Sequence, residues 1–404
     1  MVNMGELFAF PRILPMKMDR VLVGDKERSF ILQDGDLLYA RQSLVFEGAG
    51  KCSIFLGGHE PTVFESHIIR CRLNRRKADP LFYFFFFQSP LGRDAISSIV
   101  EQGAGAAGIR ASDLAKLLVP VPPLPFQIAA SSVLNALDER IETLRKANSS
   151  LEAIARAIFK SWFVDFDPVQ AKAEGREPDG MDADTAALFP RDFEDSELEE
   201  IPLGWTVREV RDVSISNRKS IGKNHVHNIE YIDISSVEPG RIASSTMCNL
   251  AEAPSRAKRL VSDGDTIWSC VRPNRRSFVL IMEPANNLVV STGFVTLTAT
   301  EIPFSFLYLS VTTSQFVEYL TLRADGAAYP AVRPDTFESA KVIVPSESIL
   351  NRFHEIAEPM LRKVAANNRQ AKTLADLRDT LLPRLISGKL RVPEAEAIIT
   401  KRGE

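Results

Sequence analysis

The sequence lacks the features that mark membrane-spanning, exported and disulfide-rich proteins. No apolar run in its 404 residues approaches the roughly 20 residues that cross a membrane. The N-terminus has no basic head followed by an apolar core, so we expect no export signal, no membrane association and a cytoplasmic location. The four cysteines at positions 52, 71, 248 and 270 show no Cys-x-x-Cys spacing. They are predicted to be free thiols rather than zinc ligands.

Recognisable catalytic motifs are also missing. Gly50-Lys51 and Gly388-Lys389 lack the upstream glycine and the following hydroxyl residue of a phosphate-binding loop. There is no Gly-x-Ser-x-Gly, no His-Glu-x-x-His, no Gly-x-Gly-x-x-Gly and no Asn-Pro-Pro-aromatic sequence. His225 and His227 lack acidic or cysteine companions and are predicted to be loop histidines. These absences argue against a stand-alone nuclease or methyltransferase, and we expect no metal and no cofactor on this chain.

The composition is that of a globular protein whose charge is unevenly distributed. Hydrophobic residues make up 45% and charged residues 25%, and the length predicts two or three domains. The net charge is −3, but eleven acidic and three basic residues fall between Gln170 and Glu200. This segment is therefore expected to be an acidic linker of net charge −8. The rest of the chain carries +5, which permits DNA binding without requiring it.

The chain contains an internal repeat. Asp34-Gly35-Asp36, followed by a β-type run, returns 229 residues later as Asp263-Gly264-Asp265. Gly105-Ala106-Ala107 leads to Val119-Pro120, and Gly326-Ala327-Ala328 leads to Val344-Pro345. Each proline precedes a long helical pattern. A repeated unit of globular domain plus helix builds a pseudo-twofold molecule, which suits a partner with two separated half-sites.

Both helical patterns carry apolar residues at alternating steps of three and four. The two stripes are Leu134, Leu137, Ile141, Leu144, Asn148, Leu151, Ala155, Ile158 and Trp162, and Leu350, Phe353, Ala357, Met360, Val364, Asn367, Ala371, Leu374, Leu381 and Leu385, interrupted by Arg378. We expect the two helices to pair antiparallel as a coiled coil. Asn148 and Asn367 are expected to set its register at some cost in stability, so leucine at either position should raise the melting temperature.

Basic and amide side chains follow the repeated turns in both halves. Arginine reads guanine and Asn or Gln reads adenine, whereas lysine chiefly holds phosphate. Many arginine runs are simply solvent-exposed faces. The position of both clusters after the same turn therefore supports DNA contact more strongly than any single residue does. The candidate DNA contacts are Arg41, Gln42, Lys51, Arg75, Arg76 and Arg110 in the first half, with Arg72 and Lys77 nearby. In the second half they are Arg218, Lys219, Arg272, Asn274, Arg275, Arg276, Tyr329 and Arg333, with Lys223 nearby.

Three motifs resemble hallmarks of one family. They are the stretch from Ile158 to Pro168, the sequence Ile201-Pro202-Leu203-Gly204-Trp205, and the stretch from Leu381 to Leu390. The segment from Val119 to Gln127, ahead of the first helix, fits the same pattern. Together they resemble the specificity subunit of type I restriction–modification systems, over essentially the whole chain. The resemblance implies a non-catalytic subunit with two target-recognition domains, each reading half of a bipartite DNA site.

The resemblance also implies partners. Two modification (methyltransferase) subunits would dock on the helices and restriction (translocase–nuclease) subunits would join, with S-adenosylmethionine, ATP and magnesium bound by those partners. The residues expected at this spacer and partner interface are Leu137, Ile141, Leu144, Asn148, Trp162, Phe163, Met360, Asn367, Leu374 and Leu381. A helix of about 35 residues spans roughly 50 Å, which would offset the half-sites by more than one turn of DNA.

The expected fold class is α+β. We expect recognition domain 1 over 1–125, helical spacer 1 over 126–168, the acidic linker over 169–200, recognition domain 2 over 201–347, spacer 2 over 348–390 and a tail over 391–404. Residues 81–102 are expected to be helical and Val119 to Pro125 extended.

One departure concerns the first domain. Ile201 lies 62 residues before Asp263, but only 33 residues precede Asp34, and they contain no Gly-Trp opening. The first domain is therefore expected to lack its first segment, and a truncated gene product, a misassigned start codon or a divergent domain would each explain this. If the domain is truncated, we expect reduced stability or loss of half the specificity. The alternative function is a protein-interaction scaffold that uses the paired helices.

Overall fold

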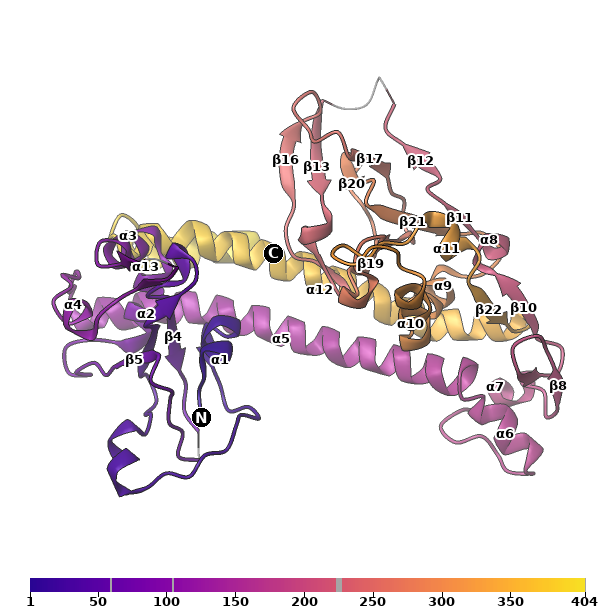
Figure 1. The fold of residues 1–404 in the computed structure, drawn as a ribbon, viewed down its shortest axis with the longest axis horizontal. Helices are drawn as coiled ribbons and strands as arrows, with labels where there is room; N and C mark the ends of the chain where they lie inside the picture. The colour runs from indigo at the N-terminus through magenta and orange to yellow at the C-terminus, as the bar shows by residue number, and fades with distance from the viewer. Residues whose placement is uncertain (59, 104, 223–226, 404) are drawn as a thin grey trace. The chain divides into compact units, whose positions relative to one another are not determined.

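The structure, a computed structural model, describes residues 1–58, 60–103, 105–222 and 227–403 (Figure 1). It divides into two compact units. Unit 1 is Met1–Thr143 with Gln370–Glu404, and unit 2 is Leu144–Arg369. Two unbroken 40-residue helices, α5 (Leu124–Phe163) and α12 (Glu347–Ile386), each contribute residues to both units. A search of the described helices found none with the length and apolar character of a membrane span.

Unit 1 is built on a mixed four-stranded sheet. Its strands, in spatial order, are β1 (Arg12–Ile13), β4 (Cys52–Phe55), β2 (Leu37–Ala40) and β5 (Ile68–Cys71), and only the β1–β4 pair is parallel. Helix α1 (Met4–Ala9) precedes β1, and a short 3₁₀ turn, η1 (Asp25–Phe30), precedes β2. All four residues of β2 are buried, so the sheet is covered on both faces.

The aromatic run becomes α2 (Pro80–Gln88) and is followed by α3 (Pro90–Ser97). Ser89 breaks the expected helix because it ends α2 and accepts a hydrogen bond from Gly92 as the N-cap of α3. Phe82, Phe84 and Phe85 are almost fully buried in a core that also includes Leu134 of α5 and Leu381 of α12. The aromatic run thus joins the sheet of unit 1 to both long helices.

The remaining elements of unit 1 are short. A small sheet contains β3 (Gln42–Ser43), β7 (Ala107–Gly108) and β6 (Glu101–Gln102), and a 3₁₀ turn, η2 (Phe46–Gly48), follows β3. Helix α4 (Ala111–Leu114) precedes an extended segment over 117–123, and α13 (Val392–Gly403) follows α12.

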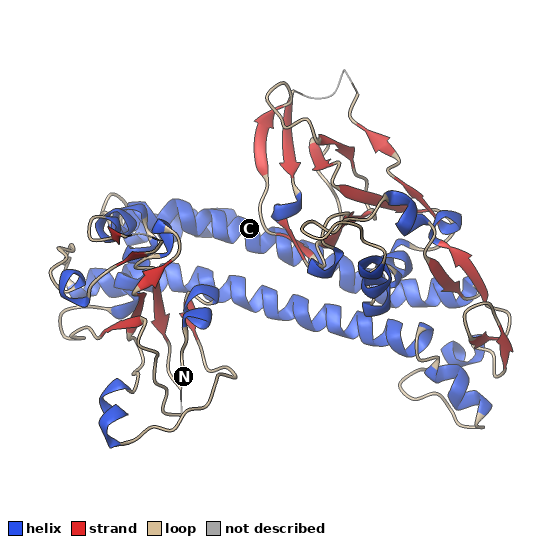
Figure 2. Cartoon of the chain, in the orientation of Figure 1, coloured by secondary structure: helices blue, strands red, loops and turns tan. Residues whose placement is uncertain are grey.

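Unit 2 has the larger share of strands (Figure 2). One sheet contains β11 (Ser214–Ser216), β21 (Phe294–Ala299), β18 (Thr266–Ser269) and β19 (Phe278–Leu280). A second contains β12 (Lys219–Ser220), β17 (Ala257–Leu260), β20 (Leu288–Ser291), β13 (Asn228–Ile232) and β16 (Thr246–Asn249). Two-stranded pairs join β10 (Thr206–Glu209) to β22 (Lys341–Val344) and β14 (Val237–Glu238) to β15 (Arg241–Ile242). The helices are α8 (Val210–Val213), α9 (Phe304–Ser310), α10 (Ser314–Leu322) and α11 (Pro334–Glu338), with the 3₁₀ turns η3 (Ile234–Ser236) and η4 (Pro273–Arg275).

The segment expected to be an acidic linker carries regular structure. It contains most of α6 (Asp167–Ala173), all of α7 (Ala183–Leu188) and β8 (Phe193–Asp195), and it reaches β9 (Glu200–Pro202), which pairs with β8. Val169 and Phe189 are buried in the core of unit 2, and the ring of Phe189 lies 5.1 Å from that of Trp162. The acidic residues form only the exposed side of this segment, so a charge count could not show that its apolar residues pack.

The predicted antiparallel helix pair is confirmed. In unit 2, Asn148 contacts Asn367, and Phe159 further along α5 contacts Phe353 earlier on α12. In unit 1, Arg378 donates to Asp138 at 2.7 Å, and this contact explains the arginine that interrupts the apolar stripe. Because both side chains are largely buried, removing one partner would leave the other charge poorly solvated and would lower the free energy of unfolding.

The two seam asparagines are hydrogen-bonded to each other. Asn367 Nδ2 donates to Asn148 Oδ1 at 2.8 Å, and Asn148 Nδ2 donates to Asn368 Oδ1 at 2.8 Å. Asn148 is 7% and Asn367 3% exposed. Because Asn148 accepts a buried hydrogen bond from Asn367, either single leucine removes one partner of that bond, and the expectation that it raises the melting temperature needs correction.

We therefore expect Asn148→Leu or Asn367→Leu alone to lower the free energy of unfolding by about 1 to 2 kcal/mol. The first leaves Asn367 Nδ2 without its acceptor, and the second leaves Asn148 Oδ1 without its donor. The double variant should recover this loss and melt at or above the temperature of the wild type. Thermal melts of the three variants measure this. A double variant less stable than both single variants would contradict it.

Candidate nucleic-acid interface

The repeated Asp-Gly-Asp turns have the same geometry in both units. Gly35 and Gly264 both adopt φ of 82°, a left-handed conformation that favours glycine. Gly35 N–H donates to Phe55 O at 2.8 Å, and Gly264 N–H donates to Ile281 O at 2.9 Å. Each turn therefore helps to place β2 beside β4, or β18 beside β19.

The last aspartate of each turn is buried and satisfied in a related way. Asp36, 1% exposed, accepts two 2.7 Å hydrogen bonds from Arg72, and Asp265, 3% exposed, accepts one of 2.7 Å from Thr298. Burial raises the pKa of Asp265, while the hydrogen bonds from Thr298 and Ser262 oppose this rise. Arg72, which belonged to the predicted basic cluster, is therefore engaged in holding the turn.

The opposite ends of β2 and β18 also match. Ile109 N–H donates to Arg41 O at 3.0 Å, and Val332 N–H donates to Cys270 O at 2.8 Å. The segment after each glycine-rich loop thus crosses the end of the repeated strand. Arg110 and Arg333 then occupy the same place, as N-cap residues of α4 and α11. The sequence repeat is therefore a repeat of tertiary structure.

In unit 2 this crossing gathers most of the predicted residues. The Arg272 guanidinium lies 4.6 Å from the centre of the Tyr329 ring and donates to Ala328 O at 3.1 Å. Between Arg272 and Arg276, the 3₁₀ turn η4 exposes Asn274 and Arg275. Tyr329 is 71% exposed. An aromatic ring, an amide and several guanidinium groups thus share one surface. We call this surface the unit 2 crossing; it consists of Arg272, Asn274, Arg275, Arg276, Tyr329 and the exposed Arg333.

The backbone of the unit 2 crossing is strained. Arg272 and Arg276 have φ of 51° and 57°, which non-glycine residues rarely adopt. The position equivalent to Arg276 in unit 1 is Gly50, with φ of 71°. Backbone strain of this kind is often found at functional sites, where the position of a side chain matters more than the conformational energy of its backbone.

We expect Arg276→Gly to raise the free energy of unfolding of unit 2 by about 0.5 kcal/mol, because relief of the left-handed conformation exceeds the entropic cost of glycine. Arg275→Gly is the matched control and should lower it by a similar amount, since Arg275 has no positive φ. Denaturant melts followed by tryptophan fluorescence measure both. Destabilisation by Arg276→Gly as large as that by Arg275→Gly would contradict the expectation.

The unit 1 crossing contains Arg41, Gln42 and Arg110 but differs in its loop. Gln42 pairs with Gly108 across β3 and β7, and Arg110 forms a 2.7 Å ion pair with the exposed Glu101. Leu44 and Val45, which follow, are 89% and 60% exposed. The sequence analysis missed these apolar side chains because a short apolar run looks like core until its neighbours are known.

The remaining predicted contacts lie elsewhere. Arg75 pairs with Asp34 at 2.9 Å at the start of β2, and Arg76 is exposed close by. Arg218 and Lys219 are exposed near the buried Asp265 at the start of β18. The turn there faces α12, since Asp263 pairs with Arg362 at 3.2 Å. These four residues therefore lie at the opposite strand end from the crossings.

Lys51 is not available for phosphate in this structure. Its ammonium donates to Phe8 O at 2.8 Å and lies 5.3 Å from the Phe8 ring centre, and burial lowers its pKa. The Lys51 side chain therefore links α1 to the sheet of unit 1.

The predicted histidine and cysteine sites are a loop pair and free thiols. Lys223 and His225 lie outside the described residues. Within the described residues, no group of three or more His, Cys, Asp or Glu side chains could hold a metal ion. Burial raises the pKa of Cys52 far above its usual value and that of Cys270 to about 11. Both thiols are therefore protonated at neutral pH and poorly nucleophilic.

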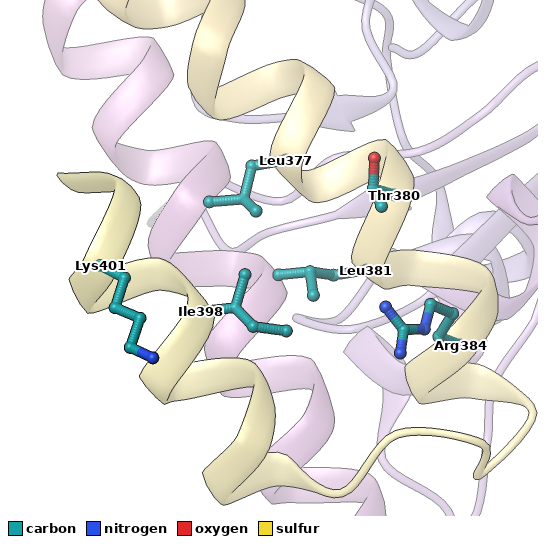
Figure 3. A pocket seen from close by; sticks show the side chains of 6 residues that line it. All are labelled: Leu377, Thr380, Leu381, Arg384, Ile398 and Lys401. Atoms are coloured by element: carbon teal, nitrogen blue, oxygen red, sulfur yellow. The ribbon is translucent and has the colours of Figure 1, made fainter.

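The predicted interface residues of the helices mostly fill the seam between them. Eight are buried, and only Met360 and Leu374 are half-buried. A partner would therefore contact other faces of these helices. One cavity of about 310 Å³ lies between α12 and α13, lined by Leu377, Thr380, Leu381, Arg384, Ile398 and Lys401 (Figure 3). It contains none of the crossing residues, so it is separate from the candidate interface.

The chain is similar to known specificity subunits of type I restriction enzymes. A family model described as "Type I restriction modification DNA specificity domain" matches residues 22–153. The HindI specificity subunit of Haemophilus influenzae is 24% identical over 89% of this chain and 87% of its own length. The MjaIX specificity subunit of Methanocaldococcus jannaschii is 24% identical over 78% of this chain and 69% of its own length.

The chain therefore resembles specificity subunits of type I restriction–modification systems along most of its length, and residues 22–153 match their DNA specificity domain. A solved specificity subunit from M. genitalium shares its fold, with a TM-score of 0.53 at 15% identity over 88% of this chain and 84% of that one. Given this resemblance, the two crossings are candidate surfaces for contacts with DNA.

Proposed function

We propose that this chain reads a bipartite DNA sequence and directs partner subunits to it. Each unit reads one half-site through its crossing. The observation that supports this most strongly is the repeated junction in which Arg110 and Arg333 cap equivalent helices beside equivalent strand ends. Such a junction presents guanidinium and amide groups at the end of a rigid strand, where they reach base edges and phosphates.

The half-sites in this proposal differ from each other. The unit 1 crossing presents Gln42 with exposed leucine and valine side chains, whereas the unit 2 crossing presents arginines, Asn274 and a tyrosine ring. Apolar side chains contact the thymine methyl group, and arginine prefers guanine. An asymmetric target follows, with a more G-rich half read by unit 2.

Recognition rather than bond making is the proposed role. Two methyltransferase subunits would supply S-adenosylmethionine chemistry, and restriction subunits would use ATP and magnesium. The faces of α5 and α12 outside the seam are the proposed docking surface. Exposed Ile128 and Ile154 on α5 are apolar and are available for such contacts.

The test is methylation of a random duplex library by the purified chain combined with its modification subunit. A bipartite, asymmetric consensus is the expected result, and methylation without one would refute the proposal. DNA affinity should fall steeply with salt because phosphate contacts release counterions. Absent or salt-insensitive DNA binding would favour the alternative of a protein-interaction scaffold.

A further inference from the structure

Strand β17 of unit 2 carries basic side chains that were not among the predicted DNA contacts. Arg256 directly precedes the strand, and Lys258 and Arg259 belong to it. Arg256 and Lys258 are exposed, and Arg259 is half-buried. Among the described residues, none of these three side chains forms an ion pair, whereas Arg241 of the same unit pairs with Glu238. Their positive charges therefore lack a counterion within the described part of the chain.

A β-bulge turns the Arg259 side chain to one face of its sheet. Ala257 lies opposite Ser291 of β20, and Arg259 lies opposite Val290, so the register shifts by one residue between them. In a regular strand, Arg259 would share the face of Ala257, which is buried in a small apolar cluster. Because of the bulge it shares the face of Val290 instead. The guanidinium thereby lies near the thiol of Cys270, at the end of β18.

Hydrogen bonds connect β17 to the unit 2 crossing. The carbonyl of Arg256 accepts from Thr292 N–H at 2.8 Å, and the carbonyl of the next residue, Gly293, accepts from Cys270 N–H at 2.9 Å. The carbonyl of Cys270 in turn accepts from Val332 N–H at 2.8 Å, in the segment that crosses the end of β18. The start of β17 therefore lies beside the strand end at which the crossing is built.

The protein satisfies Arg259 poorly. Its Nε is buried and has no hydrogen-bond partner among the residues that the structure describes. Burial lowers the pKa of Arg259, and the Cys270 thiol supplies no counterion at neutral pH because burial raises its own pKa to about 11. A guanidinium withdrawn from water without a counterion lowers the stability of the free protein. An arginine that is retained at such a cost indicates a negatively charged partner.

We propose that Arg259 binds a phosphate of the DNA backbone when unit 2 contacts its half-site. This inference rests on the proposed function. Phosphate oxygens accept hydrogen bonds from a guanidinium and supply the missing negative charge. The exposed Arg256 and Lys258 extend the same positive strand. Because phosphate contacts carry no sequence information, Arg259 sets the position of unit 2 on the duplex without reading bases.

The test compares Arg259→Met with the wild type, each as the full-length chain combined with its modification subunit. The variant should bind every DNA sequence about 5- to 10-fold more weakly, and the slope of log affinity against log salt should become shallower by about 0.9. The consensus in both half-sites should stay the same. Without DNA, the full-length variant should melt about 2 to 4 °C higher than the wild type, since an apolar side chain replaces an unpaired, partly buried charge. A purely structural arginine would not combine higher stability with weaker binding.

Two further variants complete the test. Arg259→Lys keeps the charge and should retain most of the affinity and the salt slope, and Arg241→Met, which removes a paired arginine, should alter neither by much. An unchanged salt slope, a lower melting temperature or loss of preference in one half-site for Arg259→Met would each overturn the inference. Salt-insensitive binding by the wild type would refute the proposed function as well, whereas normal binding by Arg259→Met beside a salt-dependent wild type would refute this inference alone.

Discussion

Phe353→Ala is expected to lower the free energy of unfolding of unit 2 by about 3 to 5 kcal/mol, the usual cost of deleting a buried aromatic ring. The Phe353 side chain is fully buried, and its ring centre lies 5.0 Å from Phe163 and 6.0 Å from Trp162, both on α5. The same ring contacts Phe306 of α9 at 6.4 Å. Loss of this ring therefore loosens the helix pair and the globular part of unit 2 together.

Tryptophan fluorescence during denaturant unfolding measures this effect in one unit only, because all three tryptophans, Trp162, Trp205 and Trp268, belong to unit 2. Lys363→Ala, an exposed position on the same helix, is the matched control and should change the free energy by no more than about 0.5 kcal/mol. A loss below about 1 kcal/mol for Phe353→Ala would show that the aromatic cluster repacks.

The combined variant Arg272→Ala and Tyr329→Ala is expected to weaken specific DNA binding by about 1 to 3 kcal/mol, roughly 5- to 150-fold. The ring positions the guanidinium, and both lie at the unit 2 crossing. The variant should lose sequence preference in one half-site and keep it in the other, because unit 1 is unchanged. Methylation of a random duplex library reads out both half-sites at once.

Arg218→Ala is the control for this pair, since Arg218 is an exposed arginine of the same unit at the other end of β18. It should change affinity and salt dependence only slightly and leave the consensus intact. Equal loss of half-site preference in both variants would show that the unit 2 crossing is not the surface that reads the half-site. An unchanged consensus in the Arg272 and Tyr329 variant would have the same consequence.

The repeat and the helices could be predicted because their signals are local or periodic. The Asp-Gly-Asp turn needs a left-handed glycine followed by an aspartate that accepts a backbone N–H at the start of the turn, and both residues are visible in the local sequence. The apolar stripe of α5 repeats at steps of three and four, so its buried face follows from helical geometry alone. Arg378 looked like a defect in the second stripe because its partner, Asp138, is 240 residues away in sequence.

The site could be predicted only in part. Sequence order placed a basic cluster after each turn, but the fold separated it into residues at the crossing and residues at the turn. Arg72 and Lys51 were candidates for DNA and instead hold Asp36 and α1. A charged side chain pairs with whatever the fold brings within 3 Å, and that neighbour is not encoded at a fixed spacing.

By itself, the sequence determined that this chain is a repeated α+β unit with two long paired helices, because glycine turns, caps and apolar periodicity depend on neighbouring residues. Only the tertiary structure decided which arginines remain exposed at the crossings and that the acidic segment folds. These outcomes depend on hydrogen-bond partners and buried contacts between distant parts of the chain, which are settled by packing.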